Sequence, residues 1–446
     1  MKGLNYNRIC KYIVTSVCNG PLHIGNAVGG IEEVLVHPVN GLPFIQAASI
    51  AGIFRKCCDR MNPELTKNLF GTAIVDSIET QSRVRFSDGK FSNNIIMELR
   101  PHVRINRKRG SVDAASDSGQ KFNMEYIGAG AEFVFTIYLY YVEESESFLK
   151  TAMEEILAVF QNEGLQFGAK KSSGAGQVFL SELRYKEFDL RDQKGRNEWI
   201  NEDNLDICEY NRMKKLEKII SGCKAYTVTV KGRTEGSILV KGLSGGFGKN
   251  APNSENIQNA QREYIVPGSS LRGAIRSQME KIASYLKREV LIMSAFGTAN
   301  NDDEAGNIGN LIFYDTIIER TEFNREMSLS YRIHIDKFTG GVFQKGLFRE
   351  KNAAGSMNLK IDIQNRNHPK ATLALLILAL RDLAIHTMSL GSGYSTGKGM
   401  IDVKEIEILR AADQKRAVIS FEAAPKITDT KGILETAFDS LKNMGA

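Results

Sequence analysis

The spacing of apolar residues predicts the same order of elements in two halves of the chain. Residues 10–17 and 225–230 are rich in β-branched side chains, which favours strands. Residues 133–141 alternate between aromatic and aliphatic side chains, a pattern typical of a strand. A helix with apolar residues on one face is predicted at 149–160, and residues 372–388 occupy the equivalent place in the second half.

A glycine-rich loop and a last strand complete each half, at 178–183 and 401–408. Near the start of each half, a glycine-rich stretch (25–30 and 242–248) is followed by a helix that begins with serines. The order is strand, helix, strands, helix, strand, which is the ferredoxin-like β-α-β-β-α-β arrangement. We therefore predict an α+β fold of two tandem ferredoxin-like (RRM-related) domains with inserted loops and hairpins.

Short sequence matches support an internal duplication. Tyr12-Ile13-Val14-Thr15 is echoed by Tyr226-Thr227-Val228-Thr229. Five further matches keep the same order: 49–55 with 270–276, 70–72 with 296–298, Asp88 with Asp315, 105–107 with 335–337, and 173–176 with 396–399. We expect a first domain at 1–195, a charged linker at 196–222, a second domain at 223–411 and a C-terminal extension at 412–446 whose residues 433–443 form an amphipathic helix.

Composition narrows the class of protein. The 446 residues are 42% hydrophobic and 25% charged, enough for two or three domains with their own cores, which excludes a disordered chain. The six cysteines contain no C-x-x-C pair, so neither a zinc site nor a disulfide framework is indicated. The first residues lack a signal peptide, and the longest apolar run, 373–380, is too short to span a bilayer. We expect a cytoplasmic protein with no membrane partner.

The net charge of +6 is mild, so any contact with a polyanion must come from local clusters. The first candidate is the string 264–276, where Ser269 and Ser270 stand at a helix start and Arg272 and Arg276 lie one turn apart. Hydroxyls and free backbone N–H groups at a helix start suit a phosphate, although an ordinary serine cap is the alternative.

The first half keeps less of this string, with Ser49 and Arg55 at the matching positions. We therefore expect the second half to bind phosphate more strongly.

Two glycine-rich loops, 168–176 and 391–399, form the second candidate. Glycines, hydroxyls and lysines suit a backbone phosphate. The expected contacts are Lys170, Lys171, Ser172, Ser173 and Gly174 in the first loop and Ser395, Thr396, Gly397 and Lys398 in the second. A nucleotide-binding P-loop does not fit, because the Walker A spacing fails and the loops precede a strand.

A basic run at 100–110, with five Lys or Arg residues and no acid, is the third candidate. Such a run alone is usually a solvated face. It recurs at 331–337, however, which favours a nucleic-acid groove. The expected contacts are Arg104, Arg107, Lys108 and Arg109, with Arg332, His334 and Lys337 as their counterparts.

Candidates for catalysis are few. The six histidines form no metal-binding or catalytic pattern. Glu32 and Glu33 follow a glycine-rich stretch and are candidate catalytic carboxylates beside a phosphodiester, with plain surface charge as the alternative. In the second half the matching loop contains no Asp and offers only Glu255 and Glu263.

The string 264–276, the Phe-Gly-Thr turns, Asp88 and Asp315, the hairpin at 335–340 and the glycine-rich loops together resemble the RAMP superfamily of CRISPR-associated proteins. The resemblance extends over nearly the whole chain. It is closest to the backbone subunits of type III CRISPR effector complexes, here as a tandem fusion of two such subunits.

The resemblance implies that each domain grips guide RNA, that protomers stack along it, and that a hairpin thumb follows residues 104 and 334. Base pairing would then read a complementary target RNA while protein holds the backbone. The implied partners are guide RNA, target RNA and other effector subunits. Many such subunits cut target RNA with an Asp before the serine-containing helix. This chain has Glu32 and Glu33 there instead, with Mg²⁺ as the cofactor if cutting occurs.

Two other functions stay open from the sequence. A guide-RNA-processing endoribonuclease of the same superfamily typically relies on a histidine base and lacks the Ser-Ser-Leu-Arg-Gly helix. A non-catalytic scaffold without RNA binding would show no salt-dependent association with RNA.

Overall fold

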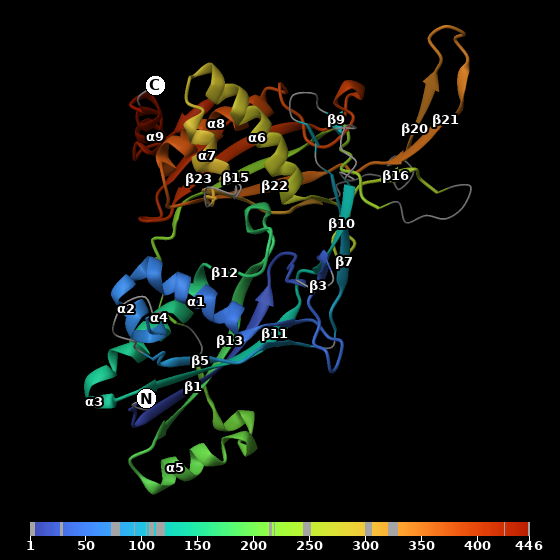
Figure 1. Ribbon diagram of the computed structural model, residues 1–446. Helices are drawn as coiled ribbons and strands as arrows, with labels where there is room; N and C mark the ends of the chain where they lie inside the picture. The colour runs from blue at the N-terminus through green and yellow to red at the C-terminus, as the bar shows by residue number, and fades with distance from the viewer. Residues whose placement is uncertain are drawn as a thin grey trace. The chain divides into compact units, whose positions relative to one another are not determined.

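The computed structural model describes residues 5–26, 30–72, 81–92, 94–103, 105–106, 111–112, 121–213, 216–217, 219–243, 251–298, 306–319, 329–422 and 424–444. The chain forms two compact units (Figure 1). Unit 1 contains Met1–Met97, Glu125–Lys171 and Ala175–Cys223. Unit 2 contains Glu98–Met124, Ser172–Gly174 and Lys224–Ala446. Two short segments from the first half of the sequence therefore pack with the second half.

Unit 1 is built on an antiparallel sheet with strand order β12-β13-β1-β11-β6-β4. Its strands are β1 Arg8–Cys18, β4 Phe44–Ile45, β6 Gly89–Phe91, β11 Glu132–Tyr141, β12 Leu165–Gln166 and β13 Gln177–Asp189, with β5 Val84–Phe86 on β11 and β14 Asn211–Met213 on β13. A separate pair joins β2 Gly25–Asn26 to β3 Gly30–Val34.

Apolar helices pack on one face of this sheet. They are α1 Ala47–Met61, α2 Pro63–Phe70 and α4 Phe148–Asn162, with the short α3 Glu143–Glu146 before α4. Phe54 of α1 lies at the centre of the core, and its ring centroid is 5.3 Å from that of Phe86, 5.9 Å from Phe135 and 5.7 Å from Phe160. Every second residue of β11 is buried because alternate side chains face these helices.

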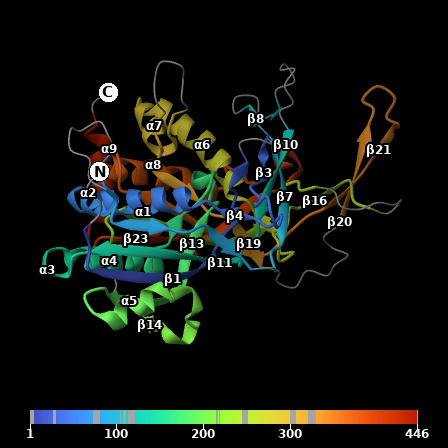
Figure 2. The ribbon, with the colours of Figure 1, turned by 60° about the horizontal axis from the view of Figure 1, so that its bottom comes forward.

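The other face of the same sheet carries the segment that the sequence predicted as a linker. Residues 196–222 do not form an extended connection: they belong to unit 1 and contribute to α5 Gln193–Ile200, the 3₁₀ turns Glu202–Asn204 and Ile207–Glu209, and β14. Figure 2 shows α5 and β14 on the side of β1 away from α1. Trp199 holds the segment, with its ring centroid 5.8 Å from Tyr138 and 5.3 Å from Phe188.

An ion pair also joins this segment to the sheet. Lys11 of β1 is 8% exposed and pairs with Glu202, whose other carboxylate oxygen accepts a hydrogen bond from the Tyr138 hydroxyl. In RRM-type proteins, aromatic residues on the open sheet face stack on RNA bases. In unit 1 this part of the face is covered by protein.

Unit 2 repeats the architecture with strand order β17-β19-β22-β15-β23-β24-β25. The strands are β15 Lys224–Glu235, β17 Ile265–Val266, β18 Leu311–Phe313 (on β22), β19 Thr316–Glu319, β22 Ser356–Gln364, β23 Met400–Arg410, β24 Arg416–Ser420 and β25 Lys426–Thr428. The helices are α6 Gly268–Tyr285, α7 Val290–Phe296, α8 Pro369–Ala384 and α9 Ile433–Lys442.

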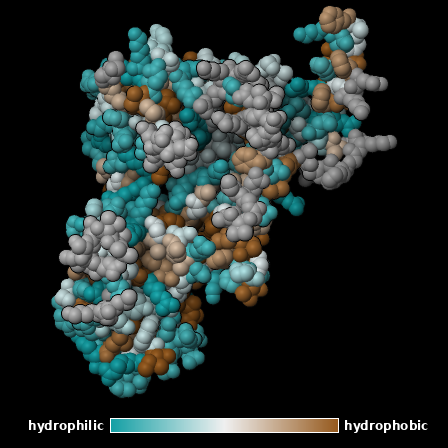
Figure 3. Space-filling model, viewed as in Figure 1, coloured by the Kyte–Doolittle hydropathy of each residue, from teal (hydrophilic) through white to brown (hydrophobic). Residues whose placement is uncertain are grey.

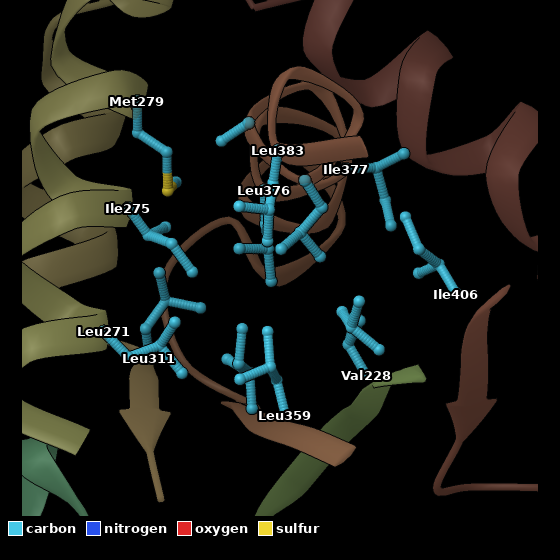
Figure 4. Close-up of a cluster of buried hydrophobic side chains, with 14 of the residues drawn as sticks. Val228, Leu271, Ile275, Met279, Leu311, Leu359, Leu376, Ile377, Leu383 and Ile406 are labelled. Atoms are coloured by element: carbon cyan, nitrogen blue, oxygen red, sulfur yellow. The ribbon is translucent and has the colours of Figure 1, made fainter. Parts of the chain in front are cut away.

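The core of unit 2 lies between α6, α8 and the sheet (Figure 4). Leu271 and Ile275 of α6 point toward Leu376 of α8 and Leu359 of β22, and all four are fully buried. The predicted C-terminal helix is confirmed as α9, which buries Ile433, Leu434, Ala437 and Leu441 in this core.

Two hairpins extend from these cores. One pairs β7 Met97–Val103 with β10 Lys121–Ile127, and β8 Ile105–Asn106 pairs with β9 Ser111–Val112 beyond it. The other pairs β20 Leu329–Ile335 with β21 Val342–Lys351, and β16 Ser254–Glu255 joins β21 near its base. Figure 1 shows the β20–β21 hairpin projecting from unit 2.

The predicted fold is confirmed. In each unit the first strand lies between the last strand and the strand before the second helix, as in a ferredoxin-like sheet. Within the described residues, no helix is both long enough and apolar enough to cross a membrane.

Candidate nucleic-acid interface

The serines stand at the starts of their helices but do not cap them. Helix α1 begins at Ala47 and α6 at Gly268, so Ser49, Ser269 and Ser270 lie inside the first turn. The residues that precede the helices make no side-chain capping bond. The interpretation of these serines as helix caps is therefore wrong, and their hydroxyls stay candidates for contact with a ligand.

A carboxylate caps each helix instead. The Ala47 N–H donates to Asp88 Oδ1 at 2.7 Å, and the Gly268 N–H donates to Asp315 Oδ1 at 2.8 Å. The first N–H group of each helix, which we expected to face a phosphate, already has an anionic partner. The sequence marked Asp88 and Asp315 as matched positions of the two repeats. Their role as helix caps could not be predicted, because it depends on the turns that follow β5 and β18.

In unit 2 this cap belongs to a buried ion network. Asp315 Oδ2 accepts a hydrogen bond from Arg100 Nη1 at 2.6 Å, and Arg100 Nε donates to Glu98 Oε2 at 2.7 Å. Glu98 Oε1 in turn accepts the Ala260 N–H at 2.8 Å. Burial alone would lower the pKa of Arg100, but the carboxylates of Asp315 and Glu98 raise it overall. Arg100, the first cation of the predicted basic run, is thus held inside the protein.

Two arginines of α6 contact the end of α7. Arg272 Nη2 donates to the carbonyl of Phe296 at 3.0 Å, and Arg276 pairs with Glu280 at 2.8 Å. Both guanidinium groups lie over the Phe296 ring, 5.5 and 5.3 Å from its centroid. Arg55 makes the comparable contact in unit 1, to the carbonyl of Gly71 at 3.4 Å. Any contact of these arginines with RNA stays a prediction.

The tip of the first glycine-rich loop packs within unit 2. A Cβ atom on Gly174, whose φ is +81°, would lie 2.3 Å from the Phe313 carbonyl oxygen. A Cβ atom on Gly268 would lie 2.5 Å from the carbonyl oxygen of Ser173. The backbone of Ser172, Ser173 and Gly174 therefore sits directly against the start of α6, and both glycines are needed for this close approach.

Lys171, which precedes this tip, lies in unit 1 among other cations. Lys56 and Arg60 are four residues apart on the exposed face of α1, the face that also carries Ser49. Burial lowers the pKa of Lys171, to about 8, and the positive charges of Lys56 and Arg60 lower it further. We call Lys56, Arg60 and Lys171 the α1 basic cluster. Neighbouring Lys170 is exposed and has a positive φ of 56°.

Sequence reasoning missed Lys56 and Arg60. Their i, i+4 spacing on the polar face of α1 was a usable signal. Their proximity to Lys171, which is more than 100 residues away in the sequence, could not be predicted. It depends on how the loop after β12 folds back.

The lysine of the second loop is buried. Lys398 is 8% exposed, and its Nζ lies 2.5 Å from Glu350 Oε2, 3.1 Å from Asn352 Oδ1 and 3.3 Å from Ser330 Oγ. Burial by itself would raise the pKa of Glu350, but Lys398 lowers it overall. The prediction that Lys398 presents its ammonium to phosphate is therefore wrong for this structure. The lysine fixes the loop to the base of the β20–β21 hairpin.

The remaining residues of that loop are accessible. Ser395, Thr396 and Gly397 are exposed at the 3₁₀ turn Tyr394–Thr396, and the Thr396 hydroxyl donates to the Gly393 carbonyl at 2.8 Å.

The β20–β21 hairpin carries cations and large apolar side chains together. Arg332, His334 and Lys337 are all exposed, and Arg332 reaches Glu350 at 3.4 Å. Phe338 at the turn is 99% exposed. Further exposed apolar side chains on the hairpin are Tyr331, Ile333, Ile335, Val342, Phe343, Leu347 and Phe348, and Figure 3 shows hydrophobic surface on it. Arg104, Arg107, Lys108 and Arg109 lie outside the described residues.

Among the described residues, no catalytic site is formed around the candidate carboxylates. Glu33 is exposed on β3, and the side chain of Glu32 on the same strand is outside the description. In the second repeat, Glu255 pairs with Lys351 at 2.5 Å and accepts the Tyr264 hydroxyl at 3.1 Å. Within the described residues, no three His, Cys, Asp or Glu side chains are grouped so that they could hold a metal ion.

Comparisons with known proteins agree with the duplication. The sequence profile of the RAMP superfamily matches the chain twice, over residues 17–178 and 239–402. Among solved structures, the chain is similar to one in a cryo-EM structure of the type III-B Cmr-beta bound to cognate target RNA, with 18% identity and a TM-score of 0.31. That match covers 40% of this chain and 61% of the other, which is less than two thirds of its length. No curated protein sequence matches.

Breaking the Lys398–Glu350 pair should loosen the β20–β21 hairpin. Lys398→Met leaves the buried Glu350 carboxylate with only the longer 3.4 Å contact to Arg332, which costs about 3 kcal/mol. We expect faster amide hydrogen exchange along β20 and β21, and a smaller effect in the double variant Lys398→Met/Glu350→Leu. Ser395→Ala, in the same loop but exposed, is the matched control. Unchanged exchange in Lys398→Met would contradict the buried pair.

Proposed function

This chain belongs to the RAMP superfamily, and from that premise we propose that it is a guide-RNA-binding backbone subunit of a type III CRISPR antiviral effector complex. The family domain occurs twice, so one chain would occupy two adjacent segments of guide RNA. Complementary target RNA and other effector subunits are the remaining partners in this proposal.

The observation that carries the proposal is the α1 basic cluster. Lys171 is half-buried yet positively charged at neutral pH, and the nearby charges that shift its pKa are those of two other cations. Positive charges that act on one another in this way favour an anion as the ligand. The phosphates of an RNA backbone provide evenly spaced negative charges for this purpose.

The covered sheet supports the same location. In unit 1, Trp199 and Glu202 occupy the face on which an RRM-type protein would stack bases. A ligand of unit 1 would therefore contact the helix side and the loops, where the α1 basic cluster lies. Backbone contact without base stacking suits a protein that leaves sequence reading to base pairing.

The β20–β21 hairpin supports the role of a thumb between segments of guide and target. Its exposed Arg332, His334 and Lys337 side chains accompany aromatic side chains, and aromatic rings stack on bases without sequence preference. The Lys398–Glu350 pair holds the base of this hairpin, which would keep its direction fixed relative to the sheet of unit 2.

The two other functions are less well supported. A guide-processing endoribonuclease needs a positioned base, and among the described histidines His23 is buried with its Nδ1 2.7 Å from the Glu125 carbonyl. A scaffold without RNA binding gives no reason for a half-buried lysine to face two other cations.

The direct test is to purify the protein from its native operon context and to sequence the RNA that copurifies. We expect guide RNA, bound with a salt-dependent affinity.

The double variant Arg60→Ala/Lys171→Ala should weaken binding and reduce the slope of log K against log salt by about 0.7 per lost phosphate contact. Lys194→Ala removes an exposed cation of α5 on the opposite side of the sheet and is the matched control. Absence of RNA, or equal salt slopes in both variants, would rule out this role.

Binding should also depend on pH through Lys171. Its pKa of about 8 lies below the ordinary lysine value, so the side chain loses its charge between pH 7 and 9 in the free protein. A bound phosphate raises that pKa, and affinity should therefore fall about tenfold from pH 7 to 9. Lys171→Arg, which stays charged, should abolish most of this decline. A decline of equal size in both proteins would assign it to another group.

The double variant Glu32→Gln/Glu33→Gln separates holding RNA from cutting it. Neither carboxylate favours an anionic ligand, so we expect affinity for guide RNA to stay the same or to rise slightly. Labelled complementary RNA with Mg²⁺ measures cutting in the same preparations, and any cut made by the first repeat should disappear in this variant. Lost affinity for guide RNA would show that these residues are part of the binding surface.

A further inference from the structure

The α1 basic cluster contains a lysine whose surroundings suit a nucleophile as well as a cation. We propose that Lys171 is a modification site that acyl phosphates acylate. In these small molecules a carboxylic acid and a phosphate share one bridging oxygen. The inference rests on the proposed function, because it assigns a means of regulation to the cluster that we expect to hold RNA phosphates.

The loop before Lys171 is fixed to unit 1 by its main chain. The Ala169 N–H donates to the His23 carbonyl at 2.9 Å, and the Gln166 side chain donates to the Lys171 carbonyl at 3.2 Å. Gly168 has a φ of +64°, and a Cβ atom there would lie 2.1 Å from the His23 carbonyl oxygen. The loop is therefore held close to its neighbours, which limits where the Lys171 side chain can lie.

Among the residues that the structure describes, no carboxylate pairs with the ammonium of Lys171. The side chain is half-buried, and the charged groups that act on it are Lys56 and Arg60 of α1. Burial and these two positive charges lower the pKa of Lys171 to about 8. Lys398 of the matching loop has the opposite environment, because it pairs with Glu350. The two loops therefore place their lysines in surroundings that favour different protonation states.

The neutral form of an amine is the one that attacks a carbonyl carbon. At pH 7.5 an amine with a pKa of about 8 is neutral about a quarter of the time, and an ordinary lysine about once in a thousand. A nucleophile also becomes intrinsically less reactive as its pKa falls, which offsets roughly one factor of ten if amines follow thiols. We therefore expect Lys171 to react about tenfold faster than an ordinary exposed lysine.

The two cations of α1 favour an acyl donor that carries a phosphate. A guanidinium such as that of Arg60 holds a phosphate through paired hydrogen bonds. In an acyl phosphate only one oxygen atom separates the carbonyl carbon from phosphorus, so a phosphate held at Arg60 brings the carbonyl to Lys171. The phosphate is also the leaving group, and nearby positive charge stabilises the negative charge that it gains. An acyl donor without phosphate benefits only from the neutral amine.

The transfer needs no other reagent. The lone pair of the neutral Lys171 Nζ forms a bond to the carbonyl carbon, and the bond between that carbon and the bridging oxygen breaks. Inorganic phosphate leaves with the bonding electrons, and the nitrogen loses one proton to water. The product is an uncharged amide, so the α1 basic cluster loses one of its three positive charges. We expect acylation to weaken the binding of RNA at this cluster.

The test treats the full-length, RNA-free protein with acetyl phosphate at pH 7.5 and follows acetylation of each lysine by mass spectrometry. Lys170, which is adjacent in the sequence, and Lys194 of α5 are exposed and are the references within the same sample. We expect Lys171 to be acetylated about tenfold faster than either reference. Equal rates at the three lysines would overturn the proposal.

A second acyl donor separates selection by phosphate from simple reactivity. N-hydroxysuccinimide acetate transfers the same acetyl group but carries no phosphate. The preference for Lys171 over Lys170 should be several times larger with acetyl phosphate, and Arg60→Gln should remove this difference between the donors. An equal preference with both donors in the unchanged protein would overturn the assignment of acyl phosphates as the reagent.

The affinity for guide RNA before and after acetylation measures the regulatory effect. We expect about fivefold weaker binding after acetylation of Lys171, little change in Lys171→Arg after the same treatment, and slower acetylation of Lys171 when RNA is already bound. Unchanged affinity in the acetylated protein would overturn the regulatory role. Because acetylation is first measured without RNA, selective acetylation of a protein that binds no RNA would contradict the proposed function alone.

Discussion

The carboxylate that begins the first helix of each unit is the constraint on which the rest of the arrangement depends. Asp88 and Asp315 follow the short strands β5 and β18, and they accept the first N–H of α1 and α6. This bond fixes where each helix starts relative to the sheet, and so where the helix directs its basic face. It also means that the first N–H group of each helix already has an anionic partner.

The two repeats use one plan for different purposes. In unit 2, Lys398 pairs with Glu350 and Arg100 pairs with Asp315. These two ion pairs hold the two hairpins to the core. In unit 1, Lys171 remains beside other cations at the edge of α1. Removing one partner of a buried ion pair destabilises the protein, because the other charge stays buried alone. A cluster of like charges, in contrast, is stabilised when an anion binds. The expectation that the second repeat binds phosphate more strongly stays a prediction.

The insertion between the repeats decides which surfaces remain available. Trp199 and Glu202 attach residues 193–213 to the sheet of unit 1, on the face away from its helices. Covering that face protects apolar sheet surface from water and removes it as a platform for bases.

The sequence by itself determined the duplication, the ferredoxin-like order of elements and the C-terminal helix, because these follow from periodic burial along the chain and from matched short motifs. The sequence also located the two glycine-rich loops and the basic stretch that forms the β20–β21 hairpin. Only the tertiary structure decided which charges are free to act. Lys398 was an expected phosphate contact and Arg100 is the first residue of the predicted basic run, yet Asp315 lies 215 residues from Arg100 and Glu350 lies 48 residues from Lys398. Charge neutralisation between residues that far apart depends on packing, which no local pattern records.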